Sequence, residues 1–312
     1  TAEVRGEKFG TKPIAFAFKG VCFMNLRPGP FVRASFAILA LSIVAFSFVP
    51  RSDYGGFGDH VARLKISGVI LDNSARDTAL RMAAKQKDIK ALIVEINSPG
   101  GTFVGGEALF RYLREIARNK PVVAVLGGTA TSAAYMAAIG SDYIIARNGT
   151  ITGSIGVIMQ TADITNMLSK LGIKPETIKS GPLKAQPNPL EYFIPEARIV
   201  AKELIQDLYR SFVEMVETRR GMTKETVLAL ADGRIFSGRQ ALANGLVDAI
   251  GGIPEARAWL EKKYQIGVNL HLEDLEIKDD GVSWRSFLRA IIGKTLFSES
   301  LRLDGVLSVW QR

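Results

Sequence analysis

Cysteine and histidine are almost absent from this sequence of 312 residues. The one cysteine is Cys22, and the two histidines are His60 and His271. A single cysteine excludes an intramolecular disulfide, and two histidines far apart in the sequence argue against a histidine-rich metal site. We therefore expect no metal, and any chemistry has to come from other side chains.

The glycine-rich parts of the sequence lack nucleotide-binding signatures. Residues 96–102 read I-N-S-P-G-G-T, and residues 127–138 read G-G-T-A-T-S-A-A-Y-M-A-A. Neither contains Gly-Lys-Ser, Gly-Lys-Thr or Gly-x-Gly-x-x-Gly, the patterns with which backbone amides bind phosphates. The sequence therefore gives little support for nucleotide binding, and we expect no cofactor.

Negative charge is scarce near the N-terminus. Residues 1–33 carry six Lys or Arg and two Glu, as part of a net charge of +9. Residues 34–49, A-S-F-A-I-L-A-L-S-I-V-A-F-S-F-V, then contain no charged residue, and Pro50 closes them. A bilayer-spanning helix usually needs roughly 20 apolar residues, so this run is short, although Phe31 and Val32 extend it.

We interpret residues 34–50 as a transmembrane signal anchor. The basic residues 1–33 before it form a tail in the cytoplasm, and everything after residue 50 lies on the far side of the membrane. A cleaved signal peptide and a buried helix are the alternatives. Because the positive charge is partly a property of this tail, it does not indicate a nucleic-acid partner.

Beyond residue 60 the sequence alternates short β-branched runs with amphipathic ones. Residues 107–118 place apolar side chains at helical spacing, and residues 195–220 begin with proline and end before Gly221, as a long helix does. This alternation predicts an α/β fold with βα units around a largely parallel, buried sheet. The predicted strands lie at residues 61–70, 91–97, 121–126 and 142–146.

The composition changes after residue 268. We expect residues 51–268 to form the main domain and residues 269–312 to be a C-terminal extension. Within the extension, residues 284–292 place apolar side chains at helical spacing with arginines on the other side. Such a stripe suits a membrane surface or a partner groove, and docking on its own domain is the other interpretation.

One serine, Ser132, stands among small and apolar residues. Gly127 and Gly128 before it predict a turn after a strand, which puts Ser132 near the start of a helix. Its hydroxyl there is either a nucleophile, with the amide of Ala133 beside it, or an N-cap. A second glycine turn, at residues 99–101, either offers N–H groups to an oxyanion or serves only as a tight turn.

A serine nucleophile needs a base, and both histidines lie far from this part of the sequence. A lysine can serve instead if burial or nearby positive charge keeps it neutral. Lys184 lies in S-G-P-L-K-A-Q-P-N-P-L, residues 180–190, which contains three prolines and no acidic residue. The alternative is a solvated loop lysine without a catalytic role.

Five motifs occur in order between residues 60 and 265. They read I-N-S-P-G-G, T-S-A-A-Y, G-T-I-T-G-S-I-G-V, I-K-S-G-P-L-K and D-G-R-I-F-S-G-R-Q-A-L-A-N-G-L-V-D-A-I-G-G. The set resembles the signal peptide peptidase A family, also called protease IV, in its short single-domain form. The resemblance implies a fold similar to Clp protease and crotonase, and a serine protease with a Ser-Lys dyad.

At the matching positions the resemblance implies a nucleophile, a general base, a hydroxyl that helps to hold the base, and two oxyanion donors. These are, in that order, Ser132, Lys184, Ser154, Gly101 and Ala133. Gly100 is the alternative to Gly101. Many members of the family have two glycines after the serine where this chain has Ala133 and Ala134, a difference that bears on substrate preference.

The family forms ring-like homo-oligomers, and in its short forms the serine and lysine meet from adjacent subunits. By this resemblance we expect a single-pass protein of a bacterial inner membrane, with its catalytic domain on the periplasmic or extracytoplasmic side. Its expected substrates are cleaved signal peptides and other apolar peptides. A crotonase-like acyl-CoA enzyme without a covalent serine, and a non-catalytic membrane scaffold, are the alternative functions.

Overall fold

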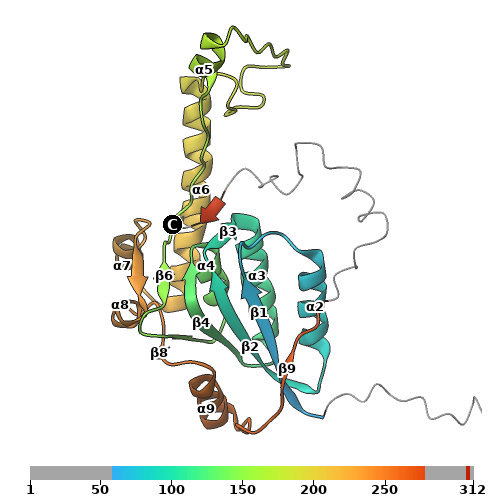
Figure 1. Cartoon of the computed structure of the whole chain (residues 1–312). Coiled ribbons are helices and arrows are strands. Elements are labelled where there is room, and N and C mark those ends of the chain that lie inside the picture. The colour runs from blue at the N-terminus through green and yellow to red at the C-terminus, as the bar shows by residue number, and fades with distance from the viewer. Residues whose placement is uncertain (1–57, 278–306, 310–312) are drawn as a thin grey trace, which may run out of the picture. The chain divides into compact units, whose positions relative to one another are not determined.

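The computed structural model describes residues 58–277 and 307–309, which form a mixed α/β fold around one large sheet (Figure 1). This confirms the α/β class. The signal anchor expected at residues 34–50 and the apolar stripe at residues 284–292 lie outside the described residues. Among the helices that the structure describes, none is both long and apolar enough to cross a bilayer.

The large sheet has eight strands and is almost entirely parallel, as predicted. Its strands are β1 (His60–Ser67), β2 (Ile89–Ser98), β4 (Val122–Thr131), β5 (Tyr143–Ala146), β6 (Ile151–Gly153), β7 (Ile235–Ser237), β8 (Ala249–Ile250) and β9 (Leu272–Asp274). Six of them follow the order β7-β6-β4-β2-β1-β9, while β5 pairs with β4 and β8 with β5. Within this sheet only β6 and β7 pair antiparallel.

Both faces of the sheet are covered, which explains why its central strands are continuous apolar runs. In β2, Leu92, Val94 and Ile96 face the larger core, and Ala91 and Ile93 face a smaller one. The smaller core is closed by α9 (Ile253–Tyr264). The helices of the larger core are α2 (Ser74–Lys85), α3 (Phe103–Ile116), α4 (Ala133–Ala138), α6 (Pro195–Arg220), α7 (Lys224–Leu230) and α8 (Gly238–Ala243).

Both predicted helices are present. The stripe expected at residues 107–118 belongs to α3, whose Leu109, Leu113 and Ile116 are buried. α6 has the predicted bounds, with proline in its first turn and Gly221 in the left-handed conformation at its C-terminal cap.

β4 changes its neighbour half-way along. Residues 123–126 pair with β5, and residues 129–131 pair with β6. The prediction of a turn at Gly127 and Gly128 is therefore wrong, because both glycines lie inside the strand. A Cβ on Gly127 would lie 3.2 Å from the Cβ of Asn97, so glycine allows β2 and β4 to approach where their register shifts.

α6 joins the rest of the fold through its C-terminal half. Phe212 and Val216 are buried in the larger core, whereas Ile199 and Val200 are exposed. Figure 1 shows the N-terminal half of α6 extending beyond the sheet, with α5 (Thr165–Lys170) and the segment that joins α5 to α6 at its far end. We call residues 165–207 the arm; its connecting segment contains turns and, as expected for residues 179–190, no helix or strand.

A second sheet of two strands lies at the start of α3. β3 (Gly100–Thr102) pairs antiparallel with β10 (Leu307–Val309). Gly101 of β3 also forms a parallel bridge with Ile70, which follows β1. Two strands from the predicted extension therefore pair with the main domain, β9 with β1 and β10 with β3.

Candidate active site

Ser132 lies in a strained turn between β4 and α4. Its φ of 57° and ψ of −119° form a combination that residues with a side chain rarely adopt and that costs about 1–3 kcal/mol. Its N–H donates to the carbonyl of Gly153 at 2.8 Å, and its carbonyl accepts from the N–H of Met136 at 2.9 Å. A strained strand-to-helix turn is also how α/β-hydrolases present a nucleophilic serine.

The hydroxyl of Ser132 does not cap α4. Ser132 occupies the N-cap position, but its side chain makes no capping hydrogen bond. Thr102 before α3 and Ser237 before α8 both cap through their hydroxyls, and both have an ordinary φ of −69°. Ser132 therefore differs from the capping residues of the same chain in both conformation and bonding, which disfavours the N-cap interpretation.

Two hydroxyl groups bond to the backbone of the turn between β2 and β3, and one of them comes from the end of β4. Thr131, which precedes Ser132 and is fully buried, donates its hydroxyl to the carbonyl of Pro99 at 2.9 Å. The hydroxyl of Ser98 accepts the N–H of Gly100 at 3.1 Å. The bond from Thr131 holds the glycine turn of residues 99–101 beside the strained serine, and the bond to Ser98 closes the turn on itself.

The two glycines of this turn differ in their surroundings. The N–H of Gly100 is used by Ser98, and the carbonyl of Gly100 accepts the N–H of Ile70 at 2.8 Å. A Cβ on Gly101 would lie 1.8 Å from the carbonyl oxygen of Ile70. Gly101 therefore has to be glycine, because the backbone of Ile70 fills the space that a side chain would need.

Ala133, the residue after Ser132, packs against α3. A Cβ on Gly106 of α3 would lie 2.9 Å from the Cβ of Ala133, and both Ala133 and Ala134 are fully buried. The methyl group that distinguishes Ala133 from glycine is thus accommodated by the missing side chain of Gly106.

Ser154 lies beside Ser132 at the end of the neighbouring strand. β4 and β6 pair with Thr131 opposite Gly153, and a serine follows each of these residues. Ser154 is buried and has a φ of 50°, and its N–H donates to the carbonyl of Arg234 at 2.8 Å. The structure therefore brings Ser132, Ser154 and the turn of Gly101 together.

The two histidines lie at the other end of the sheet. His60 begins β1, and the carbonyl of His271 accepts the N–H of Val61 at 2.9 Å, so the two are neighbours despite their distance in sequence. β1, β2 and β4 are parallel, and Ser132 follows the last residue of β4. Within residues 58–277, which include both histidines, no histidine is therefore placed to activate Ser132.

Lys184 lies in the arm, away from Ser132. Its segment joins α5 to α6 and lies beyond the N-terminal end of α6 in Figure 1. The C-terminal half of α6 packs on the core, and Arg219 in its last turn donates to the carbonyl of Ile139, at the end of α4 away from Ser132, at 2.8 Å. The N-terminal half, residues 195–207, extends beyond the sheet and is about 20 Å long. A single chain therefore does not bring Lys184 to Ser132.

The apolar surroundings expected for Lys184 are also not formed within one chain. Lys184 and Pro182 are exposed. The carboxylate that follows this loop, Glu191, pairs with Lys179, and the hydrogen bond from Lys179 holds the pKa of Glu191 below its usual range. Glu191 is thus already engaged with another lysine.

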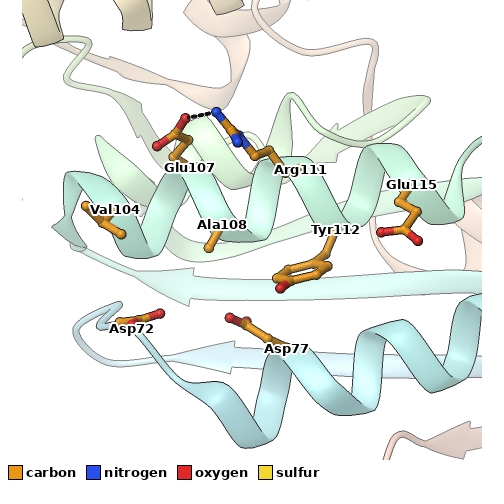
Figure 2. A pocket seen from close by; sticks show the side chains of 8 residues that line it. All are labelled: Asp72, Asp77, Val104, Glu107, Ala108, Arg111, Tyr112 and Glu115. Carbon is orange, nitrogen blue, oxygen red and sulfur yellow. Dashed lines mark hydrogen bonds and ion pairs between the residues drawn. The ribbon is translucent and has the colours of Figure 1, made fainter. Parts of the chain in front are cut away.

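A hollow of about 490 Å³ lies elsewhere, between α2 and α3 (Figure 2). Of its acidic groups, Glu107 pairs with Arg111 at 2.6 Å and Asp77 pairs with Arg76 at 3.2 Å. Neither serine nor lysine lines it, so we place the candidate active site at Ser132 and not here. The lining residues are Asp72, Asp77, Val104, Glu107, Ala108, Arg111, Tyr112 and Glu115.

Comparison with known proteins identifies the family. The model of peptidase family S49 matches residues 114–267. A protein of Enterococcus faecium that carries the name signal peptide peptidase SppA is 31% identical over 273 residues, covering 83% of this chain and 78% of that protein. The chain belongs to peptidase family S49.

Other relatives of this S49 chain are also named as proteases. One from Synechocystis is 37% identical over 200 residues, covering 64% of this chain and 72% of that protein. Protease 4 of Haemophilus influenzae is 30% identical over 260 residues, covering 80% of this chain and 41% of that protein. The resemblance to the signal peptide peptidase A family is confirmed, and the S49 chain is a serine-type peptidase.

Two solved structures show a weaker likeness. A ClpP1 variant from Listeria monocytogenes has a TM-score of 0.42 and 19% identity, covering 61% of this chain and 91% of its own. A variant of a membrane-bound stomatin-specific protease has a TM-score of 0.44 and 16% identity, covering 70% and 98%. At these scores the likeness decides neither the fold nor the assembly of the S49 chain.

Sequence reasoning missed two hydroxyls and one strand near Ser132. Ser98 and Thr131 were not singled out, although each small hydroxyl residue adjoins a glycine turn or the candidate nucleophile. Their place beside a turn could have indicated this role, since the hydroxyls of serine and threonine often bond to the backbone of a turn. β10 carried no comparable signal, because its partner β3 lies some 200 residues earlier in the chain.

Proposed function

We propose that this S49 peptidase is a membrane-anchored serine endopeptidase in which Ser132 is the nucleophile and Lys184 the general base. The observation that carries the proposal is the strained turn at Ser132, next to Ser154 and to the glycine turn of residues 99–101. Backbone strain of this size persists only where surrounding contacts impose it, and such residues cluster at active sites.

In the proposed mechanism the hydroxyl oxygen of Ser132 attacks the carbonyl carbon of a peptide bond while the neutral amine of Lys184 takes the hydroxyl proton. The N–H groups of Gly101 and Ala133 donate to the oxyanion of the tetrahedral intermediate. Gly101 is preferred to Gly100 because the N–H of Gly100 already donates to Ser98.

Collapse of this intermediate breaks the peptide bond, and the lysine proton passes to the leaving amine. An ester between Ser132 and the acyl half of the substrate remains. Water then attacks this ester, Lys184 again accepts the proton, and the acid product leaves with the serine restored. We assign the hydroxyl of Ser154 to holding the amine of Lys184, because Ser154 follows the strand next to Ser132.

The lysine has to come from a second copy of the chain if this mechanism operates. Within one chain the N-terminal half of α6 extends beyond the sheet and carries the loop of Lys184 away from Ser132, so we propose a homo-oligomer with active sites shared between adjacent subunits. The arm supports this proposal because it exposes large apolar side chains, among them Ile178 at 97% exposure, Leu171 and Tyr192. A neighbouring subunit that covered them would also bury Lys184 and favour its neutral form.

The proposed substrates are signal peptides and other apolar peptides. Support comes from the name of the Enterococcus faecium relative and from the apolar run at residues 34–49, which we propose as the anchor. The basic residues before that run favour a catalytic domain on the periplasmic side of a bacterial inner membrane. Membership of a peptidase family favours this function over the acyl-CoA enzyme and the scaffold.

The test is complementation between two inactive variants of the full-length protein in detergent. Ser132→Ala and Lys184→Ala are each expected to lose peptide cleavage, and their mixture is expected to regain part of it after subunit exchange. Lys174→Ala is the matched control, because Lys174 is another exposed lysine in the arm, and it should cleave like the wild type.

The nucleophile, the base and the shared site can each be rejected by a separate result. Cleavage by Ser132→Ala at the wild-type rate would reject the nucleophile, and cleavage by Lys184→Ala would reject the base. If both variants are inactive and exchanged mixtures of them, verified by two affinity tags on one oligomer, stay inactive, then the shared site is rejected.

A further inference from the structure

The loop that carries Lys184 is shaped by contacts within its own chain. The N–H of Lys184 donates to the carbonyl of Gly181 at 3.1 Å, and the N–H of Gln186 donates to the carbonyl of Leu183 at 3.3 Å. These two bonds close overlapping turns around the lysine. Because both lie within one chain, the loop takes this conformation without a neighbouring subunit.

Ala185, the residue directly after Lys184, has a φ of 60°, which residues with a side chain rarely adopt. Elsewhere in the described part of the chain, the residues other than glycine with a positive φ are Ser132, Ser154 and Gln265. The two serines belong to the candidate active site, and Gln265 is the C-terminal cap of α9. Backbone strain persists only where surrounding contacts impose it, so other groups have to hold the loop at Ala185.

Glu191 is the residue on which these contacts converge. Its Oε2 atom accepts from the amine of Lys179 and from the side-chain amide of Gln186, the latter at 3.0 Å. The same amide donates to the carbonyl of Tyr192 at 3.3 Å. One carboxylate therefore connects the start, the middle and the end of the loop, and we call Glu191 with Lys179 and Gln186 the clamp.

Packing of apolar side chains does not fix this loop within one chain. Leu183 and Leu190 are exposed, and the segment contains no helix or strand. The side chains of Lys179 and Glu191, by contrast, are only 13% and 24% exposed. An ion pair that is partly shielded from water is stronger than a fully exposed one, so the clamp offsets the entropy lost when the loop is ordered.

We propose that Glu191 is a positioning residue for the general base and fixes, through Lys179 and Gln186, where the loop presents the amine of Lys184. This inference rests on the proposed role of Lys184 and adds a residue that takes no part in the proton transfer itself. Gln186 follows Lys184 by two residues, so its bond to Glu191 restrains the backbone next to the base. A base acts only within hydrogen-bond reach of its proton, and a misplacement of about 1 Å can lower a rate about 10²-fold.

The first test compares cleavage of one peptide by full-length wild type, Glu191→Ala and Glu191→Gln in detergent. Glu191→Ala should lower kcat about 10- to 100-fold and leave KM within about twofold, because the base acts in the chemical step. Glu191→Gln keeps an oxygen that can accept from Gln186, so its kcat should lie between the other two. Glu176→Ala is the matched control, because Glu176 is an exposed carboxylate shortly before the loop, and it should cleave like the wild type.

A double-variant cycle tests whether Lys179 and Glu191 act as one unit. The kcat of Lys179→Ala combined with Glu191→Ala should equal that of Glu191→Ala alone, because Lys179 acts only through the carboxylate. Losses that multiply would overturn the clamp. A wild-type kcat in Glu191→Ala, with Lys184→Ala inactive, would overturn it too, as would a raised KM with kcat intact.

A second measurement needs no catalysis. A nitroxide label is attached to Lys184→Cys in full-length protein that also carries Cys22→Ser, so that the label has one site. Its spectrum should show an immobilised label when Glu191 is present and a mobile one in Glu191→Ala, whereas Glu176→Ala should leave it unchanged. Equal mobility with and without Glu191 would overturn the inference. If Lys184→Ala still cleaves, the proposed base is rejected, and this spectrum separately decides whether Glu191 holds the loop.

Discussion

Replacing Thr131 by valine removes one hydroxyl and keeps a side chain of nearly the same shape. Thr131 is fully buried, and its hydroxyl donates to the carbonyl of Pro99 at 2.9 Å. This bond connects the end of β4, where Ser132 stands, to the turn that leads into Gly101. In Thr131→Val the Pro99 carbonyl loses this partner, so the glycine turn is released from the strand that leads to Ser132, the proposed nucleophile.

The magnitude follows from the cost of leaving a buried acceptor unpaired, which is about 1–3 kcal/mol. If the distortion falls wholly on the alignment of the oxyanion donor, this energy lowers kcat about 5- to 150-fold. Complete loss of one oxyanion donor, at about 10²- to 10³-fold, sets the upper limit. KM should change little, because Thr131 is fully buried and offers no surface to a peptide.

The assay compares kcat and KM of wild type, Thr131→Val and Thr131→Ser on one peptide, together with unfolding in urea. Thr131→Ser keeps the hydroxyl and should retain most of kcat, although it loses a buried methyl group and some stability. The reasoning fails if the serine variant is as slow as the valine variant. It also fails if Thr131→Val raises KM and leaves kcat intact.

Two further predictions concern Gly101 and Asp274. Gly101→Ala should abolish cleavage and lower the free energy of unfolding by about 3 kcal/mol, because the new Cβ would lie 1.8 Å from the carbonyl oxygen of Ile70. Gly149→Ala is the control, because a Cβ there has no neighbour within 4 Å, and it should change neither cleavage nor stability. Equal unfolding midpoints for the two variants would refute this prediction. The hydrogen bond from Arg63 holds the pKa of Asp274 at about 2, below the unfolded value of about 3.9, so its stabilising contribution is complete above about pH 5 and is lost as pH falls through 2. The difference in unfolding midpoint between wild type and Asp274→Asn should therefore shrink between pH 5 and pH 2, and a difference independent of pH would contradict this account.

The layers of the fold were predictable from local patterns. Strands buried on both faces become apolar runs, and the stripe of Leu109 and Leu113 identifies a helix on the sheet. The course of β4 was not predictable in the same way. Gly127 and Gly128 resemble a turn locally, but pairing first with β5 and then with β6 keeps them in one strand. Tertiary pairing therefore outweighed the local preference of glycine.

The positions of some residues of the candidate site could also be predicted from the sequence, whereas those of others could not. Ser132, Ser154 and Gly101 follow the ends of strands, and parallel strands end at the same edge of a sheet, so their proximity follows from the βα pattern. Lys184 has no such constraint, because it lies in the arm, and in the proposed assembly its distance from Ser132 depends on a second chain. The strand pairing of β10 likewise joins residues that no periodicity relates.

The separation of Lys184 from Ser132 within one chain bears on how the enzyme is controlled. One chain builds the strained turn of Ser132 and the glycine turn of residues 99–101 beside it. The base has to be supplied from outside the chain, if the proposed dyad is correct. An isolated subunit then has a nucleophile without a base, so activity would require assembly. A dilution series tests this requirement, because loss of the base should appear as a fall in kcat as the subunit concentration falls. A kcat that stayed constant down to the isolated subunit would contradict the shared site.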